Sequence, residues 1–253
     1  MSKRNVAGAA PDGAGDRDSA ARAVREMFTS IAPRYDLLNH LLSCNVDRLW
    51  WRRAARTFRH ILERPGARAL DLCCGTGDMA FALRREGRNC APQILGVDFS
   101  HAMLQLAGTK SAAALKNGSG PNWIEADALR LPFPGEHFDL VTSAFGFRNL
   151  ADYDAGLLEI VRLLRPGGEC GILDFGEPRG AIGSLYRVYF RQVLPRVGTL
   201  ISGVRGPYAY LPASVERFPR PEEMLARMRA AGFVEATWTP YTFGIAGLYR
   251  GKR

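Results

Sequence analysis

The sequence predicts an α/β protein built on a parallel sheet with helices on both faces. Short apolar segments alternate with segments of helical periodicity along the middle of the 253-residue chain. One stretch, Ala69 to Asp78, joins a buried strand, a glycine turn and the start of a helix, as such sheets require. The predicted strands cover residues 68–73, 94–98, 122–126, 138–143 and 168–175, with two more at 233–238 and 241–250. The predicted helices cover residues 78–87, 100–116, 153–164 and 221–231.

The glycine turn predicts a site for a nucleotide-like ligand. Gly75 and Gly77 lack a Cβ, so the backbone can approach a ligand closely, and the next helix directs free N–H groups toward it. Asp98 follows about 20 residues later, so the spacing also satisfies the dinucleotide-binding fingerprint. The glycines alone therefore leave NAD and other nucleotide-like ligands open.

Carboxylates at three successive strands favour S-adenosylmethionine over NAD. Asp71, within the first strand, would repel a pyrophosphate but attract an ammonium group. Asp98 ends the second strand, where it can accept from both hydroxyls of a ribose, although an Asp before Ser100 can also cap a helix. Asp127 follows the third strand and can accept from an adenine amine. S-Adenosylmethionine carries a sulfonium and an ammonium, so a pocket ringed with carboxylates suits it.

The composition is that of a globular protein with a basic excess. Apolar residues make up 47% of the chain and charged residues 23%, with a formal charge of +9. The arginines are dispersed and no RNA-binding module is visible, so no nucleic-acid partner is predicted. The five cysteines form no CxxC pair and have no histidine at ligand spacing, so no metal site is predicted. Without a secretory or membrane-spanning segment, the sequence predicts a cytoplasmic protein.

Two regions outside the alternating core are predicted to complete a single domain of residues 19–253. Residues 1–18 predict a flexible leader, and 19–64 a helical lid whose first helix is stopped by Pro33. Arg34 and Tyr35 leave that helix end and are predicted to form a wall of the ligand site. Residues 177–219 interrupt the α/β alternation and predict a substrate cap in which tyrosines alternate with arginines.

Several longer motifs resemble the ubiquinone/menaquinone biosynthesis C-methyltransferases, which are class I enzymes that use S-adenosylmethionine. The resemblance covers residues 24–250, and the first, third and last of its segments are the more specific ones together. The segments are YDLLNHLLSCNVDRLW (35–50), LDLCCGTGD (70–78), DALRLPFPGEHFDLVTSAFGFRNL (127–150), RLLRPGG (162–168), LPRVG (194–198) and YLPASVERFP (210–219). The resemblance implies a seven-stranded sheet of order 3-2-1-4-5-7-6.

The family's donor contacts carry over to four positions of this chain. They are Thr76 in the glycine turn, Asp98, and Asp127 with Ala128. The chain departs from the family at Asp47, where His is common, and at Asp174 and Gly176, where Glu and Ser are common. Ala144 also stands where some members have a donor-contacting Ser.

The resemblance implies methylation of a ring carbon of a polyprenylated quinol. This chain lacks the aromatic-rich stretch before the first helix, which favours demethylmenaquinol over the benzoquinol of the ubiquinone route. A ring carbon becomes nucleophilic when a hydroxyl loses its proton, so the site must stabilise an oxyanion. Arg148 and Asn149 leave the fourth strand beside the donor and are the predicted catalytic residues. The structural alternative is that Arg148 pairs with Asp152 or Asp154.

The cap suggests further partners and alternatives. Its apolar residues could line a channel for the polyprenyl tail while its arginines meet anionic lipid at the inner face of the membrane. A homo-oligomer is possible. An RNA methyltransferase, a methyltransferase for another small aromatic or lipid acceptor, and a non-enzymatic quinone-binding scaffold on the same fold remain the alternatives. The intact set of Asp71, Gly75, Gly77 and Asp98 argues against the scaffold, because donor binding is what requires it.

Overall fold

The sheet of the computed structural model has seven strands in the order β3-β2-β1-β4-β5-β7-β6. The structure describes residues 8–9, 16–43, 45–114, 120–176, 178, 183 and 207–253, with backbone only at 33–42, 114 and 207–209. Strands β1 to β5 run parallel, and β7 is antiparallel to both β5 and β6. The strands are β1 (Arg68–Leu72), β2 (Gln93–Asp98), β3 (Asn122–Glu125), β4 (Phe138–Ala144), β5 (Leu164–Phe175), β6 (Glu235–Tyr241) and β7 (Ala246–Lys252). The strand order that the resemblance implies is therefore confirmed.

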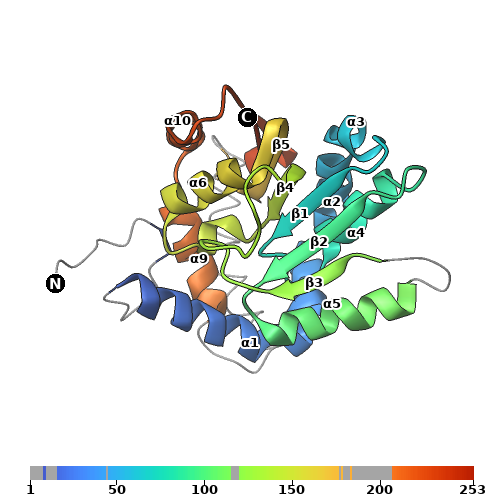
Figure 1. Cartoon of the computed structure of the whole chain (residues 1–253). Helices are drawn as coiled ribbons and strands as arrows, with labels where there is room; N and C mark the ends of the chain where they lie inside the picture. The colour runs from blue at the N-terminus through green and yellow to red at the C-terminus, as the bar shows by residue number, and fades with distance from the viewer. Residues whose placement is uncertain are drawn as a thin grey trace.

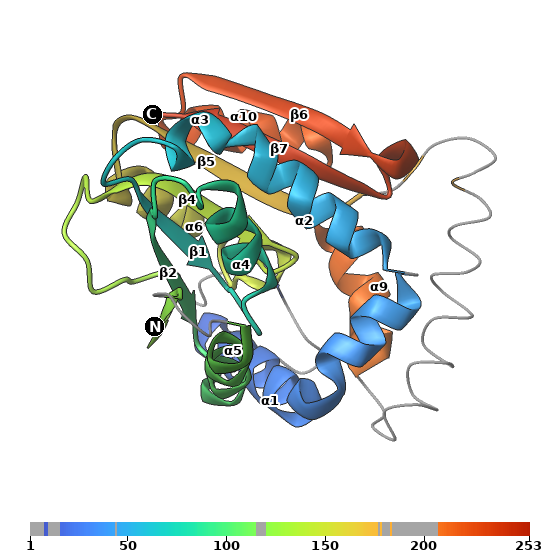
Figure 2. The ribbon, with the colours of Figure 1, turned by 90° about the vertical axis from the view of Figure 1, so that its right-hand side faces the viewer.

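Helices cover both faces of the sheet, and Figures 1 and 2 show the two layers. The helices α2, α3 and α4 lie on one face and α6 and α10 on the other, while α1 packs against α5 near the β3 edge. The helices are α1 (Arg17–Leu42), α2 (Val46–Thr57), α3 (Arg59–Leu62), α4 (Asp78–Glu86), α5 (His101–Ala114), α6 (Tyr153–Leu163), α9 (Pro207–Arg217) and α10 (Pro221–Ala231). Two short 3₁₀ helices, η1 (Phe147–Asn149) and η3 (Thr242–Gly244), follow β4 and β6.

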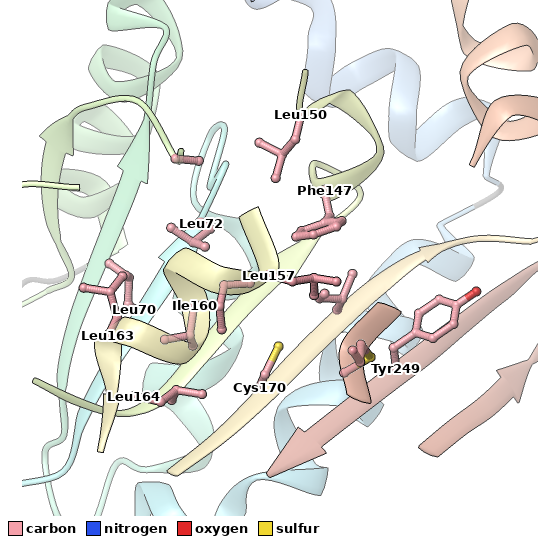
Figure 3. Close-up of a cluster of buried hydrophobic side chains, with 14 of the residues drawn as sticks. Leu70, Leu72, Phe147, Leu150, Leu157, Ile160, Leu163, Leu164, Cys170 and Tyr249 are labelled. Carbon is pink, nitrogen blue, oxygen red and sulfur yellow. The ribbon is translucent and has the colours of Figure 1, made fainter. Parts of the chain in front are cut away.

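A hydrophobic core lies on each side of the sheet, as the apolar composition of the strands requires. On one side, Leu157, Ile160 and Leu163 of α6 pack with Leu70 and Leu72 of β1, and all five are essentially inaccessible to solvent (Figure 3). The core on the other side is formed with α2, α3 and α4. Because helices cover both faces, a ligand site is expected at the carboxyl edge of the parallel strands.

The first helix does not stop where the sequence predicts. Pro33 lies inside α1, which continues to Leu42, so the predicted break is wrong. A proline inside a helix removes one backbone hydrogen bond and costs about 3 kcal/mol. The helix packs against α5, α2 and α9 and buries Val24 and Ile31, and this burial offsets that cost. Tertiary packing has therefore overridden a local stop signal.

The structure also differs from the predictions for the start of β5 and for the leader. Strand β5 begins at Leu164, before the predicted residue 168. The segment around Gly167, which has φ +77°, forms an irregularity in the pairing of β4 with β5 and not a turn between α6 and β5. Within the predicted leader, Ala9 is buried and donates a 2.7 Å hydrogen bond to the carbonyl of Leu150, so this residue is bound to the domain. Most of the predicted cap, residues 177–206, lies outside the described residues apart from positions 178 and 183.

Candidate functional site

The glycine turn after β1 uses its two glycines for different purposes. Gly75 has φ +53°, and a Cβ built there would meet nothing within 4 Å, so open space lies in front of this residue. Gly77 has φ +89°, and its Cβ would lie 2.4 Å from the Trp123 ring. Gly75 thus permits close approach of a ligand, whereas Gly77 permits packing of the turn against β3.

A pocket opens at the carboxyl ends of β1, β2 and β4. It has mostly apolar walls, to which α1 contributes Ala21 and Phe28. Four of the residues predicted to bind the donor contribute to its lining, as does one predicted catalytic residue. These five are Gly75, Asp98, Asp127, Ala128 and Asn149. The pocket is therefore at the edge where ligands of open α/β sheets bind.

Asp98 links the second strand to the glycine turn. Its Oδ2 accepts a 2.9 Å hydrogen bond from the N–H of Gly75, and its Oδ1 accepts one of 2.9 Å from the N–H of Ser100. Burial raises the pKa of Asp98 to about 6, although these N–H groups act in the opposite direction. Asp98 therefore holds the chain just before α5 and also lines the pocket, and its contact with the donor stays a prediction.

Asp127 and Ala128 follow β3 at the same edge of the pocket. The Asp127 carboxylate accepts a 2.9 Å hydrogen bond from the N–H of Leu129, which leaves its second oxygen to face a ligand. Ala128 is buried beside it and presents an apolar wall. The pocket therefore combines carboxylate acceptors at two strand ends with apolar surface between them.

Two of the predicted donor contacts lie behind the pocket wall. Asp71 is fully buried, and its Oδ1 accepts a 2.9 Å hydrogen bond from the hydroxyl of Thr142. Its Oδ2 has no hydrogen-bond partner among the described residues, and burial raises its pKa to about 7. Thr76 is also buried, and its hydroxyl accepts a 2.8 Å hydrogen bond from Lys110. Neither residue is part of the pocket lining.

Arg34 and Tyr35 lie on α1, which forms part of the pocket wall through other residues. The structure describes only the backbone of this pair, so the proposed contacts of their side chains stay a prediction.

Arg148 pairs with neither carboxylate that the structural alternative names. Its Nη1 lies 2.9 Å from Oδ1 of Asp174 and also donates to the carbonyl of Phe145. Asp152 instead caps α6 and pairs with Arg17, while Asp154 pairs with Arg227. The alternative prediction, that Arg148 pairs with Asp152 or Asp154, is therefore wrong.

The Arg148 side chain is only 5% exposed, and its Nε is a buried donor without a partner among the described residues. An unpaired donor of this kind is costly unless a ligand or water accepts from it.

Asn149 is the predicted catalytic residue that reaches the pocket. The hydroxyl of Tyr210, on α9, donates a 3.2 Å hydrogen bond to Asn149 Oδ1. With its oxygen engaged, the amide has its NH₂ group available to donate into the pocket. The sequence analysis missed Tyr210, although it begins the YLPASVERFP segment that carries part of the resemblance.

Phe145 is a second pocket residue that the sequence analysis missed. It has φ +58°, which is unusual for a residue with a Cβ, and its ring lines the pocket. The ring packs at 4.6 Å from that of Phe175 and at 5.8 Å from that of Trp50, between centroids. Trp51 lies at 6.5 Å on the same ring. These contacts give the pocket an aromatic wall, and a positive φ cannot be read from an Ala-Phe-Gly sequence.

These features fit S-adenosylmethionine. Open space faces Gly75, where backbone must approach the ligand, and carboxylates at Asp98 and Asp127 lie on either side of apolar surface suited to an adenine ring. Among the described residues no group of His, Cys, Asp and Glu side chains has the arrangement of a metal site.

Comparisons with known proteins identify the family. The model of the ubiE/COQ5 methyltransferase family matches residues 16–253. The chain belongs to this family. A demethylmenaquinone methyltransferase of Deinococcus radiodurans is 49% identical over 242 residues, covering 94% of this chain and 96% of that protein. One of Thermus thermophilus is 50% identical over 228 residues, covering 90% and 100%. A ubiquinone/menaquinone biosynthesis C-methyltransferase of Geobacter sulfurreducens is 44% identical, covering 91% and 88%.

Solved structures agree on the fold of this ubiE/COQ5 family member. A possible histamine N-methyltransferase from Thermotoga maritima aligns with TM-score 0.58 at 19% identity, covering 90% of this chain and 98% of that one. A methyltransferase from Aquifex aeolicus aligns with TM-score 0.56 at 16% identity, covering 79% and 88%. The fold is that of the class I methyltransferases, and the chain is an S-adenosylmethionine-dependent methyltransferase.

Proposed function

We propose that this chain methylates a ring carbon of a polyprenylated quinol and converts demethylmenaquinol to menaquinol. The observation that carries the proposal is that one pocket joins the carboxylates at Asp98 and Asp127 to an aromatic wall and an amide at Asn149. Two relatives named demethylmenaquinone methyltransferase share 49% and 50% identity with the chain. Relatives named for both quinone routes share 34% to 44%. The menaquinone route is therefore favoured.

The donor half of the site uses the residues at the first three strand ends. Asp98 would bind the ribose hydroxyls and Asp127 the adenine amine, with Ala128 against the base and Gly75 at the backbone approach. Thr76, Gly77 and Asp71 would support the turn from behind, and Arg34 with Tyr35 would form a wall from α1. When bound, S-adenosylmethionine supplies an electrophilic methyl group on its sulfonium sulfur.

The acceptor half uses Asn149, Arg148 and the aromatic wall. The quinol ring packs on Phe145, and the Asn149 NH₂ donates a hydrogen bond to a ring oxygen. Arg148 stabilises the negative charge that develops on that oxygen from behind the pocket lining, as a buried positive charge next to Asn149. The hydroxyl proton would leave to water first, and the ring carbon would then bond to the methyl carbon as its bond to the sulfonium sulfur breaks, which would release S-adenosylhomocysteine. Loss of the ring proton to water and return of a proton to the oxygen would restore the quinol, so one proton is released overall.

A substitution separates this role from binding of the donor. Arg148→Ala is expected to abolish turnover, while calorimetry shows donor affinity within about threefold of the wild type, because Asp98 and Asp127 are untouched. Unchanged turnover would refute the role of Arg148.

Two other acceptors and a non-enzymatic role compete with this proposal. The benzoquinol of the ubiquinone route has a single ring where demethylmenaquinol has two fused rings, and another small aromatic or lipid acceptor would use the same pocket. A quinone-binding scaffold would hold the ring without turnover. The absence of a nucleic-acid partner and the possible homo-oligomer stay predictions from the sequence.

The direct test measures methyl transfer from labelled S-adenosylmethionine to a short-tailed demethylmenaquinone, with and without dithionite. Transfer only after reduction is expected, because only the quinol can form the oxyanion. Transfer to a short-tailed benzoquinol alone would establish the ubiquinone route. Donor binding without transfer to either would refute a quinol acceptor.

We also propose contact with the inner face of the membrane, where a polyprenylated substrate resides. The predicted cap is one candidate for this contact, and most of it lies outside the described residues. None of the helices in the described part of the chain is both long and apolar enough to cross a bilayer. Cosedimentation with anionic vesicles, lost on deleting residues 183–208, would support the cap, and no binding at low salt would refute membrane contact.

A further inference from the structure

Two large apolar side chains are exposed on α2 and η3, at positions adjacent to a pair of hydrogen-bonded residues. Leu49 is 60% exposed on α2, and Phe243 is 77% exposed on the turn between β6 and β7. The two elements are joined next to these residues, since the Trp50 Nε1–H donates a 2.8 Å hydrogen bond to the hydroxyl of Thr242. Removal of these two side chains from water would be favourable, so their exposure makes this region a candidate contact surface.

The backbone holds Phe243 outward. Thr242 has φ +47° and Phe243 has φ +58°, both in the left-handed region that a residue with a Cβ seldom occupies. Such conformations persist where surrounding contacts fix them, and here Trp50 holds Thr242. The exposure of the Phe243 ring is therefore a consequence of the fixed turn.

Four arginines lie on the same helix as Leu49. Arg48, Arg52, Arg53 and Arg56 are all exposed on α2. Within the part of the chain that the structure describes, no carboxylate forms an ion pair with any of the four. The Arg53 guanidinium lies 4.3 Å from the centre of the Tyr241 ring, which places its charge beside the turn. We name Arg48, Leu49, Arg52, Arg53 and Phe243 together the α2–η3 surface.

The α2–η3 surface lies at the same edge of the sheet as the pocket. Tyr241, at the end of β6, is paired across β7 with Phe175, which ends β5 at the carboxyl edge. Figure 2 shows the start of α2 and the β6–β7 turn together at that edge. The rings of Phe175, Trp50 and Phe145 are in mutual contact, and Phe145 lines the pocket. Aromatic side chains therefore connect the surface with the site.

We infer that the α2–η3 surface docks on an anionic phospholipid bilayer. Phe243 and Leu49 insert their side chains below the headgroups, while the unpaired arginines contact lipid phosphates and keep their aliphatic stems against the apolar layer. Charge complementarity selects an anionic bilayer, and the exposed apolar pair distinguishes a bilayer from a soluble polyanion. In this orientation the carboxyl edge of the sheet, with its pocket, lies beside the membrane. The inference rests on these residues and does not depend on the acceptor.

The test measures binding of the full chain to vesicles of phosphatidylglycerol and phosphatidylcholine. The double variant Leu49→Ser with Phe243→Ser is expected to weaken binding at least about tenfold, because two buried apolar side chains are lost. Arg48→Gln with Arg52→Gln is expected to weaken it about 30-fold, since each arginine near an anionic surface contributes about 1 kcal/mol. The second loss is expected to shrink in high salt, where the charges are screened.

Matched variants away from the α2–η3 surface provide the control. Leu158→Ser with Val234→Ser removes two side chains that are 57% and 74% exposed, and Arg64→Gln with Arg229→Gln removes two exposed charges. Neither pair is expected to change vesicle binding. Donor affinity and methyl transfer to a short-tailed quinol in detergent are expected to be unchanged in all four variants, which separates docking from catalysis.

Three results would overturn the inference. One is vesicle binding by the two surface variants that equals the wild type. Another is binding that depends only on residues 183–208. The third is equally strong binding to heparin and to vesicles, lost in the arginine variant but not in the Leu49 and Phe243 variant, which would indicate a soluble polyanion.

Discussion

The Arg148 guanidinium and the Asp174 carboxylate form a buried ion pair, with Nη1 and Oδ1 2.9 Å apart. Asp174 also accepts a 3.1 Å hydrogen bond from the backbone N–H of Arg148, so one carboxylate holds both the side chain and the main chain of η1. The guanidinium lies 5.2 Å from the centre of the Phe175 ring. The pair thereby fixes the residue next to Asn149 and links the pocket rim to the end of β5.

Removing Asp174 is expected to destabilise the protein strongly. Asp174→Ala leaves the buried Arg148 charge uncompensated, which costs about 3–5 kcal/mol. Asp174→Glu, the residue common in the family, is expected to retain most of the stability. Urea unfolding monitored by circular dichroism gives the free energy of unfolding for both variants. A loss under about 1 kcal/mol for the alanine variant would mean that water solvates the Arg148 charge in place of Asp174.

The hydrogen bond from Tyr210 to Asn149 is expected to matter for turnover more than for donor binding. Burial raises the pKa of Tyr210, so its hydroxyl stays protonated and donates to Asn149 Oδ1 throughout the neutral range. Tyr210→Phe removes the contact that orients the amide, and kcat is expected to fall about tenfold with donor affinity unchanged. The measurements are initial rates with a short-tailed demethylmenaquinol and calorimetry with the donor.

Tyr249→Phe is the matched control for Tyr210. Tyr249 is a buried tyrosine of the α6 core, and its side chain lies away from the pocket lining. Its replacement is expected to leave kcat unchanged. Equal rates for wild type and Tyr210→Phe would show that Asn149 does not need this partner.

The sequence predicts best those features that depend on neighbouring residues, and it misses those that depend on contacts between distant ones. The strands and helices around Asp71, Asp98 and Asp127 follow from alternation and turn residues, so their positions agree with the structure within a few residues. Pro33 misled because a tertiary contact can outweigh a local stop signal. The partner of Arg148 was missed because Asp174 lies 26 residues away in the sequence, and strand pairing brings the two together. Tyr210 was missed because it lies 61 residues from Asn149, and the packing of helix α9 against η1 brings the two together.

Asp71 is expected to make the stability of the unliganded protein fall as pH rises toward neutrality. Its pKa is raised from 3.8 to about 7 in the folded state, chiefly by burial. Between these values the folded state holds a proton that the unfolded state has released, so folding becomes less favourable as pH increases. Asp98, with a pKa raised to about 6, acts in the same direction.

Asp71→Asn tests this directly. In the wild type, Asp71 should lower the free energy of unfolding by about 2–3 kcal/mol between pH 5 and pH 7.5. This decrease should be absent from the variant, because the amide does not titrate. Urea unfolding at half-unit pH steps gives both profiles. Parallel profiles for wild type and Asp71→Asn would show that Asp71 is ionised in the folded protein across this range.

Asp98 is expected to determine donor affinity through two roles at once. Its carboxylate positions the glycine turn through the N–H of Gly75, and the same group lines the pocket where a ribose would lie. Asp98→Ala removes charged hydrogen bonds worth about 1.5–3 kcal/mol each, so donor affinity should fall at least about tenfold. Calorimetry with S-adenosylmethionine measures it. Asp127→Ala is the paired comparison, since it removes a carboxylate from the same pocket without disturbing Gly75. A fall for Asp127→Ala alone would assign Asp98 to holding the turn. Equal losses would mean that both carboxylates contact the donor.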